Sequence, residues 1–177
     1  MHKNSSDIKL IVSDIDGTLL TSENKLHPLT EEAIRAVIDD KRCGFTLSTG
    51  RAFPLTLPMA EYFKLRIPFI YSSGAIYDPI DNRVISAHSI TPKQAEKVEK
   101  IAEKFRVGMI THTKNGMFCR VNDKDWETIK SLEWMKGERV DHARRVEDVK
   151  TDVQEEIIRL DIFDGQREEI WKPLWGY

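Results

Sequence analysis

The chain has little cysteine, no long apolar run and almost no net charge, and each shortage excludes a class of protein. Its two cysteines, Cys43 and Cys119, lie far apart and form no C-x-x-C pair. This argues against a disulfide framework or structural zinc site and favours ordinary thiols in a reducing cytoplasm. No run approaches the roughly 18 apolar residues of a membrane-spanning helix. Residues 1–9 also lack the apolar stretch of a signal peptide.

Charged residues are abundant but balanced. The 177 residues include 27 Lys plus Arg and 29 Asp plus Glu, which gives a formal net charge of −2. Such a chain has no overall electrostatic attraction for nucleic acid or for an anionic membrane. Hydrophobic residues make up 40% of the chain, a globular composition, and the length suits one ordinary domain or two small ones. We therefore expect a cytoplasmic protein with neither nucleic acid nor membrane as a partner.

The first 80 residues alternate short apolar runs with amphipathic stretches. The predicted elements are a strand over 8–12, a helix over 30–41, a strand over 45–48, a helix over 54–65 and a strand over 68–71. Thr30 is the expected cap of the first helix, and Pro58 is expected to interrupt the second. The first strand is almost continuously apolar, as expected of a strand buried on both faces. This order predicts an α/β fold, half of a doubly wound parallel sheet.

The pattern changes after about residue 80. The segments that follow predict a hairpin over 77–90, a helix capped at Thr91, a hairpin around Lys114-Asn115-Gly116, a helix over 123–135 and a strand over 158–162. The expected buried face of the helix after Thr91 consists of Ala95, Val98, Ile101, Ala102 and Phe105. These hairpins and helices are typical of an α+β domain. We therefore divide the chain into residues 1–80, half of a core domain, and residues 81–177, a smaller second domain.

Three polar motifs come directly after the first three predicted strands. They are Asp14–Thr18, Ser48–Arg51 and Ser72–Gly74. In open α/β sheets, ligands bind beyond the carboxyl ends of the strands. The sequence therefore predicts a binding or catalytic site where these motifs meet.

Asp14 and Asp16 point to a metal-dependent site. Two carboxylates so close raise one another's pKa unless a cation neutralises them. A hard divalent cation with oxygen ligands, usually Mg²⁺ inside cells, does so. A calcium-binding loop is excluded because Thr18, Leu19 and Lys25 stand where that loop needs other residues. The other alternative is that the two aspartates are ordinary turn residues without a functional role, and the apolar strand before them disfavours it.

These motifs resemble those of a known superfamily. Asp14-Ile15-Asp16-Gly17-Thr18 resembles the first motif of the haloacid dehalogenase-like superfamily, and Leu47-Ser48-Thr49-Gly50-Arg51 resembles the second. The Thr-Gly-Arg form, Ser72-Ser73-Gly74-Ala75 and a second domain after the third strand are similar to the Cof-like type IIB branch. The resemblance implies an α/β core with a cap domain. It also implies a Mg²⁺-dependent phosphatase of sugar phosphates and related small phosphorylated metabolites.

The resemblance also implies roles for the two aspartates. Asp14 would be the nucleophile that attacks phosphorus and forms an aspartyl-phosphate. Asp16 would protonate the leaving oxygen and then activate the hydrolytic water. The metal ligands would be the carboxylate of Asp14 and the backbone carbonyl of Asp16.

Phosphate binding is implied for the residues around them. Thr49 would donate a hydrogen bond to a phosphoryl oxygen, and the backbone N–H groups around Ile15 and Asp16 would hold the others. Gly50 belongs to the same phosphate-binding loop. Arg51 has two expected roles of equal weight, to assist substrate binding or to pair with a surface carboxylate.

Part of the family's site has no counterpart in the sequence. The family adds a lysine and an acidic cluster of the form Gly-Asp-x-x-Asn-Asp, and no such cluster occurs here. Ser73 stands where the family usually has Asn. Asp161–Gly165 is interpreted as a cap strand and its turn, because its spacing differs from that of the missing cluster. We therefore expect a truncated chain, whose strand over 8–12 forms an exposed edge that favours self-association. The alternative function is that of a non-catalytic fragment or pseudoenzyme that keeps half of the phosphatase site.

Overall fold

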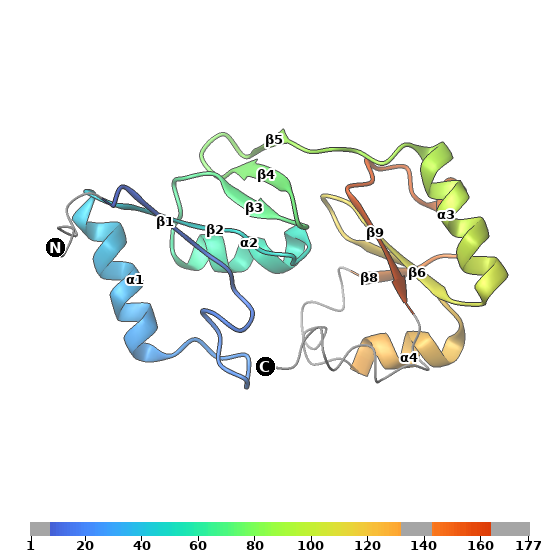
Figure 1. The fold of residues 1–177 in the computed structure, drawn as a ribbon, viewed down its shortest axis with the longest axis horizontal. Coiled ribbons are helices and arrows are strands. Elements are labelled where there is room, and N and C mark those ends of the chain that lie inside the picture. The colour runs from blue at the N-terminus through green and yellow to red at the C-terminus, as the bar shows by residue number, and fades with distance from the viewer. Residues whose placement is uncertain (1–7, 132–142, 164–177) are drawn as a thin grey trace, which may run out of the picture. The chain divides into compact units, whose positions relative to one another are not determined.

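The computed structural model describes residues 8–131 and 143–163 (Figure 1). The chain forms two compact units, one of Met1–Arg51 and Thr56–Ala87, the other of Ala52–Leu55 and His88–Tyr177. The domain limits expected from the sequence, 1–80 and 81–177, stay a prediction. Among the described residues, no helix combines the length and the apolar character needed to cross a membrane.

The elements before residue 88 alternate strand and helix. They are β1 (Leu10–Ser13), α1 (Pro28–Asp40), β2 (Gly44–Leu47), α2 (Phe53–Tyr62), β3 (Phe69–Tyr71), β4 (Ala75–Asp78) and β5 (Arg83–Ser86). β1 and β2 pair in parallel, with Ser13 opposite Leu47, and a parallel bridge from Ser48 to Ile70 continues the pairing towards β3. β3, β4 and β5 form an antiparallel sheet. Parallel strands joined through helices confirm the predicted α/β class (Figure 1).

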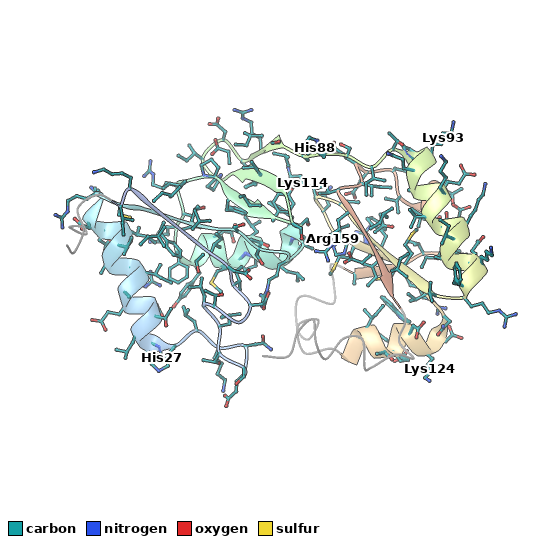
Figure 2. The ribbon with its side chains drawn as sticks, in the orientation of Figure 1. His27, His88, Lys93, Lys114, Lys124 and Arg159 are labelled. Atoms are coloured by element: carbon teal, nitrogen blue, oxygen red, sulfur yellow. The ribbon has the colours of Figure 1, made fainter. Side chains whose placement is uncertain are left out.

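α1 begins at Pro28 and has a different cap from the predicted one. His27, labelled at the start of the helix in Figure 2, is the N-cap, and its Nδ1 accepts a hydrogen bond from the backbone N–H of Leu29 at 3.2 Å. The cap predicted at Thr30 is therefore wrong. Pro28 suits the first helical position, and the imidazole supplies the acceptor that a capping side chain must provide.

α2 continues through Pro58, so the predicted interruption is wrong as well. Proline removes one backbone hydrogen bond from a helix interior. Tertiary burial offsets this cost, since Ala60 and Phe63 are each only 2% exposed. Packing thus overrides the local preference at this position.

β1 is exposed rather than buried on both faces, which corrects another prediction. Leu10, Ile11 and Val12 are 48%, 36% and 50% exposed. A parallel strand is buried when strands flank both of its edges and helices cover both faces. In the described part of the chain, β1 has one hydrogen-bonded neighbour, β2. The open apolar edge predicted from the sequence is therefore present in this part.

The second unit is built around a four-stranded mixed sheet. Its elements are α3 (Pro92–Phe105), β6 (Gly108–His112), β7 (Met117–Arg120), α4 (Asp123–Ser131), β8 (Ala143–Arg145), α5 (Val149–Asp152) and β9 (Arg159–Phe163). The strand order is β8-β7-β6-β9, in which β7 and β8 pair in parallel and the other neighbours are antiparallel. This architecture confirms the α+β pattern and the hairpin around Lys114–Gly116. The predicted helix residues 132–135 and the predicted turn after residue 163 lie outside the described residues.

The sheet of the second unit has an apolar cluster on each face. One cluster consists of Ala95, Ala102, Met109, Phe118, Val149, Val153 and Ile157. The other consists of Ala52, Leu55, Ile110, Met117, Cys119, Val121, Ile129 and Ala143. Cys119 is a buried free thiol, and burial raises its pKa to about 12.

The capping box predicted at the start of α3 is present, and the predicted buried face of this helix is confirmed at Ala95, Val98 and Ala102. The Thr91 hydroxyl accepts from the Gln94 N–H, and the Gln94 side chain accepts from the Thr91 N–H. Ile101 and Phe105 are 55% and 67% exposed, so their predicted burial is wrong.

The physical reason is a charged residue on the buried stripe of α3. Glu99 is 8% exposed. It lies 3.1 Å from the Arg120 guanidinium and accepts a hydrogen bond from the Val149 N–H at 3.3 Å. With these contacts, the side of α3 that carries Glu99 is the side that packs against the rest of the unit. Ile101 and Phe105 therefore lie on the outer side of the helix.

Candidate active site

The three polar motifs lie in the first unit, at the carboxyl ends of β1, β2 and β3. Strand register brings them together, since Ser13 pairs with Leu47 and Ser48 bridges to Ile70. The loops after the three strands therefore share one edge, as the sequence predicted. The role of each residue in these loops stays a prediction.

Asp14 is exposed on a turn that its buried neighbour holds in place. Ile15 is 0% exposed, and its carbonyl oxygen accepts from the N–H groups of Leu19 and Leu20, each at 3.0 Å. The Ile15 N–H donates to Oδ1 of Asp14 at 2.7 Å. Gly17 has a φ of 69°, in the left-handed region that favours glycine, so the chain can turn tightly here. The turn thus presents the Asp14 carboxylate outwards.

Asp16 and Arg51 form a bidentate ion pair. Nε of Arg51 donates to Oδ2 of Asp16 at 2.8 Å, and Nη2 donates to Oδ1 at 2.5 Å. The Arg51 side chain is only 7% exposed and that of Asp16 is 29% exposed. Of the two roles expected for Arg51, the structure shows the pairing with a carboxylate. That carboxylate is no ordinary surface group but the predicted acid and base.

Thr49 is buried beside this pair. It is 5% exposed, and its Oγ1 accepts a hydrogen bond from the backbone N–H of Arg51 at 3.2 Å. A hydroxyl that accepts in this way still has its own proton to donate. The geometry therefore permits the predicted hydrogen bond from Thr49 to a phosphoryl oxygen. Gly50, next to it, is exposed in the same loop.

The loop after β3 fixes the backbone of Arg51, a contact that the sequence motifs do not signal. The Ser72 N–H donates to the Arg51 carbonyl at 2.8 Å, and the Ser73 N–H donates to the Thr49 carbonyl at 3.2 Å. Ser72 and Ser73 have φ values of 46° and 63°, a left-handed conformation uncommon in residues other than glycine. Strained residues of this kind gather at functional sites. The third motif therefore contributes here through its backbone.

The residues present suit a hard cation in part. Carboxylate and carbonyl oxygens are the donors that Mg²⁺ prefers. The exposed Asp14 carboxylate meets that requirement, whereas both carboxylate oxygens of Asp16 already accept from Arg51. In the part of the chain that the structure describes, no three or more His, Cys, Asp or Glu side chains gather into a metal-binding group. The Asp14 carboxylate and the Asp16 backbone carbonyl are donors of the right chemistry for such an ion, and their role as its ligands stays a prediction.

A second polar cluster lies on the sheet of the second unit, away from the three motifs in sequence. His112 is 6% exposed and its Nε2 lies 2.9 Å from Oδ2 of Asp161, while Nε of Arg159 donates to Oδ1 at 2.7 Å. Burial alone would raise the pKa of Asp161, but the hydrogen bond with His112 and the charge of Arg159 hold that pKa below its ordinary value. Asp161 lies on β9, which confirms its interpretation as part of a strand.

Comparison with known proteins places these features in a family. The chain matches the profile of the haloacid dehalogenase-like hydrolases over residues 11–170. It is 36% identical over 85 residues to the 5-amino-6-(5-phospho-D-ribitylamino)uracil phosphatase of Bacillus subtilis, a match that covers 48% of this chain and 34% of that protein. The chain thus spans about a third of the length of this curated relative.

Solved structures show the same fold. A haloacid dehalogenase-like hydrolase from Bacteroides thetaiotaomicron superimposes with a TM-score of 0.73 at 19% identity, covering 88% of this chain and 57% of that one. A sugar phosphatase of subclass IIB has a TM-score of 0.69 at 20% identity, with coverages of 94% and 63%. With a profile match over most of its length, the chain belongs to the haloacid dehalogenase-like hydrolase family.

Proposed function

We propose that the protein is a Mg²⁺-dependent phosphatase of small phosphorylated metabolites, sugar phosphates among them, acting through an aspartyl-phosphate on Asp14. One observation carries this proposal: the exposed Asp14 carboxylate follows β1 in a fixed turn, beside the loop that holds Thr49. Phosphoryl transfer depends mainly on positioning and charge stabilisation, which such an arrangement of loops supplies. Because the chain spans only part of its relatives, its activity is inferred from the family and from this geometry.

The proposed reaction has two steps. In the first, a carboxylate oxygen of Asp14 forms a bond to phosphorus while the bond to the leaving oxygen breaks, and protonated Asp16 gives its proton to that oxygen. In the second, Asp16 takes a proton from water, whose oxygen bonds to phosphorus as the bond to Asp14 breaks. This releases phosphate and restores both carboxyl groups. A bound Mg²⁺ would neutralise charge on the nucleophile and the phosphoryl group.

A second candidate function is that of a non-catalytic, phosphate-binding fragment. The observation that favours it is the ion pair itself, because Arg51 occupies both oxygens of the group that must transfer protons. The sequence also has no Gly-Asp-x-x-Asn-Asp cluster. In this alternative, Thr49 and the N–H groups around Ile15 would bind phosphate without turnover, the Ile15 N–H exchanging its present bond to Asp14 Oδ1 for one to phosphate.

We further infer a cytoplasmic location and small-molecule rather than nucleic-acid or membrane partners. The two cysteines are free thiols, as expected in a reducing compartment. The formal net charge of −2 gives no overall attraction to polyanions.

Phosphate release from a panel of sugar phosphates, with and without Mg²⁺, tests the proposed function. We expect Mg²⁺-dependent release that falls by about a thousandfold or more in Asp14→Asn, since the amide is a poor nucleophile. Asp39→Asn, which changes an exposed aspartate on α1, is the matched control and keeps full activity. Release no greater than that of Asp14→Asn would reject the phosphatase and leave the phosphate-binding fragment.

A further inference from the structure

Arg51 carries a buried charge that must always have an anionic partner. Its side chain is 7% exposed, and a guanidinium withdrawn from water is stable only when an anion and hydrogen bonds compensate it. In this structure that anion is Asp16, held through both oxygens. Any event that withdraws Asp16 must therefore supply Arg51 with another anion.

The proposed reaction requires such a withdrawal. In this pair, Arg51 engages one lone pair on each Asp16 oxygen and fixes the orientation of the carboxylate, which restrains it from turning towards a leaving group. To act as acid and base, Asp16 must turn at least one oxygen towards the substrate. The pair seen here is therefore a resting arrangement that has to open during turnover.

The surroundings of Arg51 restrict what can move. Its N–H donates to Thr49 Oγ1, and its carbonyl accepts from the Ser72 N–H at 2.8 Å and from the Thr56 hydroxyl at 3.3 Å. The backbone is thus held from both sides, so the side chain is the part that can exchange partners. The contact with Thr49 also keeps Arg51 close to the hydroxyl expected to bind phosphate.

A phosphoryl group is the anion best suited to replace Asp16. The planar guanidinium fork matches phosphate oxygens in the same bidentate manner as it matches a carboxylate, and a phosphate dianion carries the greater charge. We propose that Arg51 is an anion-exchange switch, paired with Asp16 in the resting site and transferred to the phosphoryl group on binding, which releases Asp16 for proton transfer. This inference rests on the proposed function, because it gives the released Asp16 its task.

Inorganic phosphate is the probe, and the Nε–H resonances of the arginines report on it by NMR at a fixed Mg²⁺ concentration. We expect saturable shifts of the Arg51 Nε–H signal and of the Asp16 carboxylate carbon as phosphate is added. Arg42, which pairs with Asp40 at 2.7 Å but is 84% exposed, is the matched control, and its Nε–H signal should show no saturable shift as phosphate is added. An Arg51 signal that stays unchanged while phosphate binds, or no binding of phosphate at all, would overturn the proposal.

Calorimetry with three variants tests the competition between Asp16 and phosphate. Asp16→Asn should bind phosphate about three- to tenfold more tightly, because a competing anion for Arg51 is removed. Measured without Mg²⁺, so that the predicted metal ligation by Asp14 plays no part, Asp14→Asn removes the same charge from the same loop without freeing Arg51 and so gives the general electrostatic effect. When Arg51 is also replaced, by Arg51→Met, Asp16→Asn should no longer increase the phosphate affinity by more than Asp14→Asn does. The switch would be contradicted if Asp16→Asn and Asp14→Asn increased the phosphate affinity equally. It would also be contradicted if the extra increase from Asp16→Asn persisted in the presence of Arg51→Met.

The two proposals can fail separately. Turnover with an unmoved Arg51 signal would reject the switch and leave the phosphatase. Absent turnover with a saturable exchange at Arg51 would reject the phosphatase and support the exchange as part of a phosphate-binding site.

Discussion

Asp16 and Arg51 lie 35 residues apart in the sequence, and their pairing is the central interaction of the candidate site. The first motif brings a carboxylate to the end of β1 and the second brings a guanidinium to the end of β2. Because parallel strands end at the same edge of the sheet, the two groups meet without any local signal for it. Their pairing links the loop of the predicted nucleophile to the loop of the predicted phosphate ligand.

Removal of Arg51 should destabilise the protein. Arg51→Ala leaves Asp16 without its partner and a space where a buried guanidinium packed, so we expect the free energy of unfolding to fall by about 2–3 kcal/mol. Arg42→Ala, which breaks an exposed pair, should change it by less than about 0.5 kcal/mol. Urea unfolding of both variants checks this. Equal effects would show that the Asp16–Arg51 pair adds no stability.

Residue-level prediction worked where the chemistry is local and stopped where a partner comes from elsewhere in the chain. The capping box of Thr91 and Gln94 was predictable because both residues lie within one turn. The partner of Arg51 was not, since a guanidinium suits a substrate phosphate and a carboxylate equally well. The support that Ser72 gives to the Arg51 carbonyl likewise depends on how β2 and β3 align.

At the scale of elements, the antiparallel pair of β6 and β9 holds a charged cluster on a largely buried sheet. His112 lies opposite Arg159, and Ile110 lies opposite Asp161, so the His112–Asp161 contact runs diagonally across the two strands. The lowered pKa of Asp161 means that its ionised carboxylate is more stable, relative to the protonated form, in the folded protein than in the unfolded chain.

This linkage predicts a pH-dependent contribution of Asp161 to stability. Because the folded-state pKa is below the unfolded value of about 3.9, the contribution is present above about pH 4 and is lost as the pH falls through the folded pKa. Asp161→Asn should therefore cost about 1 kcal/mol at pH 7 and progressively less below pH 4. Denaturant unfolding across this range measures the difference. Glu127→Gln, which changes a carboxylate whose side chain is 70% exposed, is the control. A cost for Asp161→Asn that stays constant with pH would contradict the linkage.

The boundaries and exposed faces of elements were less predictable than their existence and order. α1 takes its cap from His27 rather than Thr30, and α2 includes Pro58. In both cases, a local preference yields to a contact or burial that the sequence pattern does not encode. α3 differs for the same reason, because the buried Glu99 has a partly buried cationic partner, Arg120, that periodicity cannot reveal.

At the scale of the whole molecule, the first unit has an open apolar edge. Ile8, Leu10 and Val12 are 56%, 48% and 50% exposed, and in the described part of the chain β2 is the hydrogen-bonded neighbour of β1. Open edges with apolar side chains invite strand pairing between chains. The α/β class was predictable from the strand and helix spacing, whereas the exposure of β1 depends on neighbours that a local apolar pattern does not report.

We expect the 177-residue chain to self-associate through β1. Sedimentation velocity should show concentration-dependent assembly that Ile11→Lys abolishes, because a charged residue on an edge strand opposes pairing. Leu29→Lys changes a side chain of α1 that is 68% exposed and away from the edge, and should leave assembly unchanged. A monodisperse monomer across the concentration range would refute this expectation.

The most direct measurement of the central claim is transfer of labelled phosphate from a sugar phosphate to the chain. The account predicts an acid-stable, hydroxylamine-labile label on the wild-type chain in the presence of Mg²⁺, which is the behaviour of an acyl phosphate on Asp14. Asp14→Asn should carry none, because its amide cannot form the aspartyl-phosphate. A wild-type chain that releases phosphate but never takes up the label, or a label that persists in Asp14→Asn, would contradict the account.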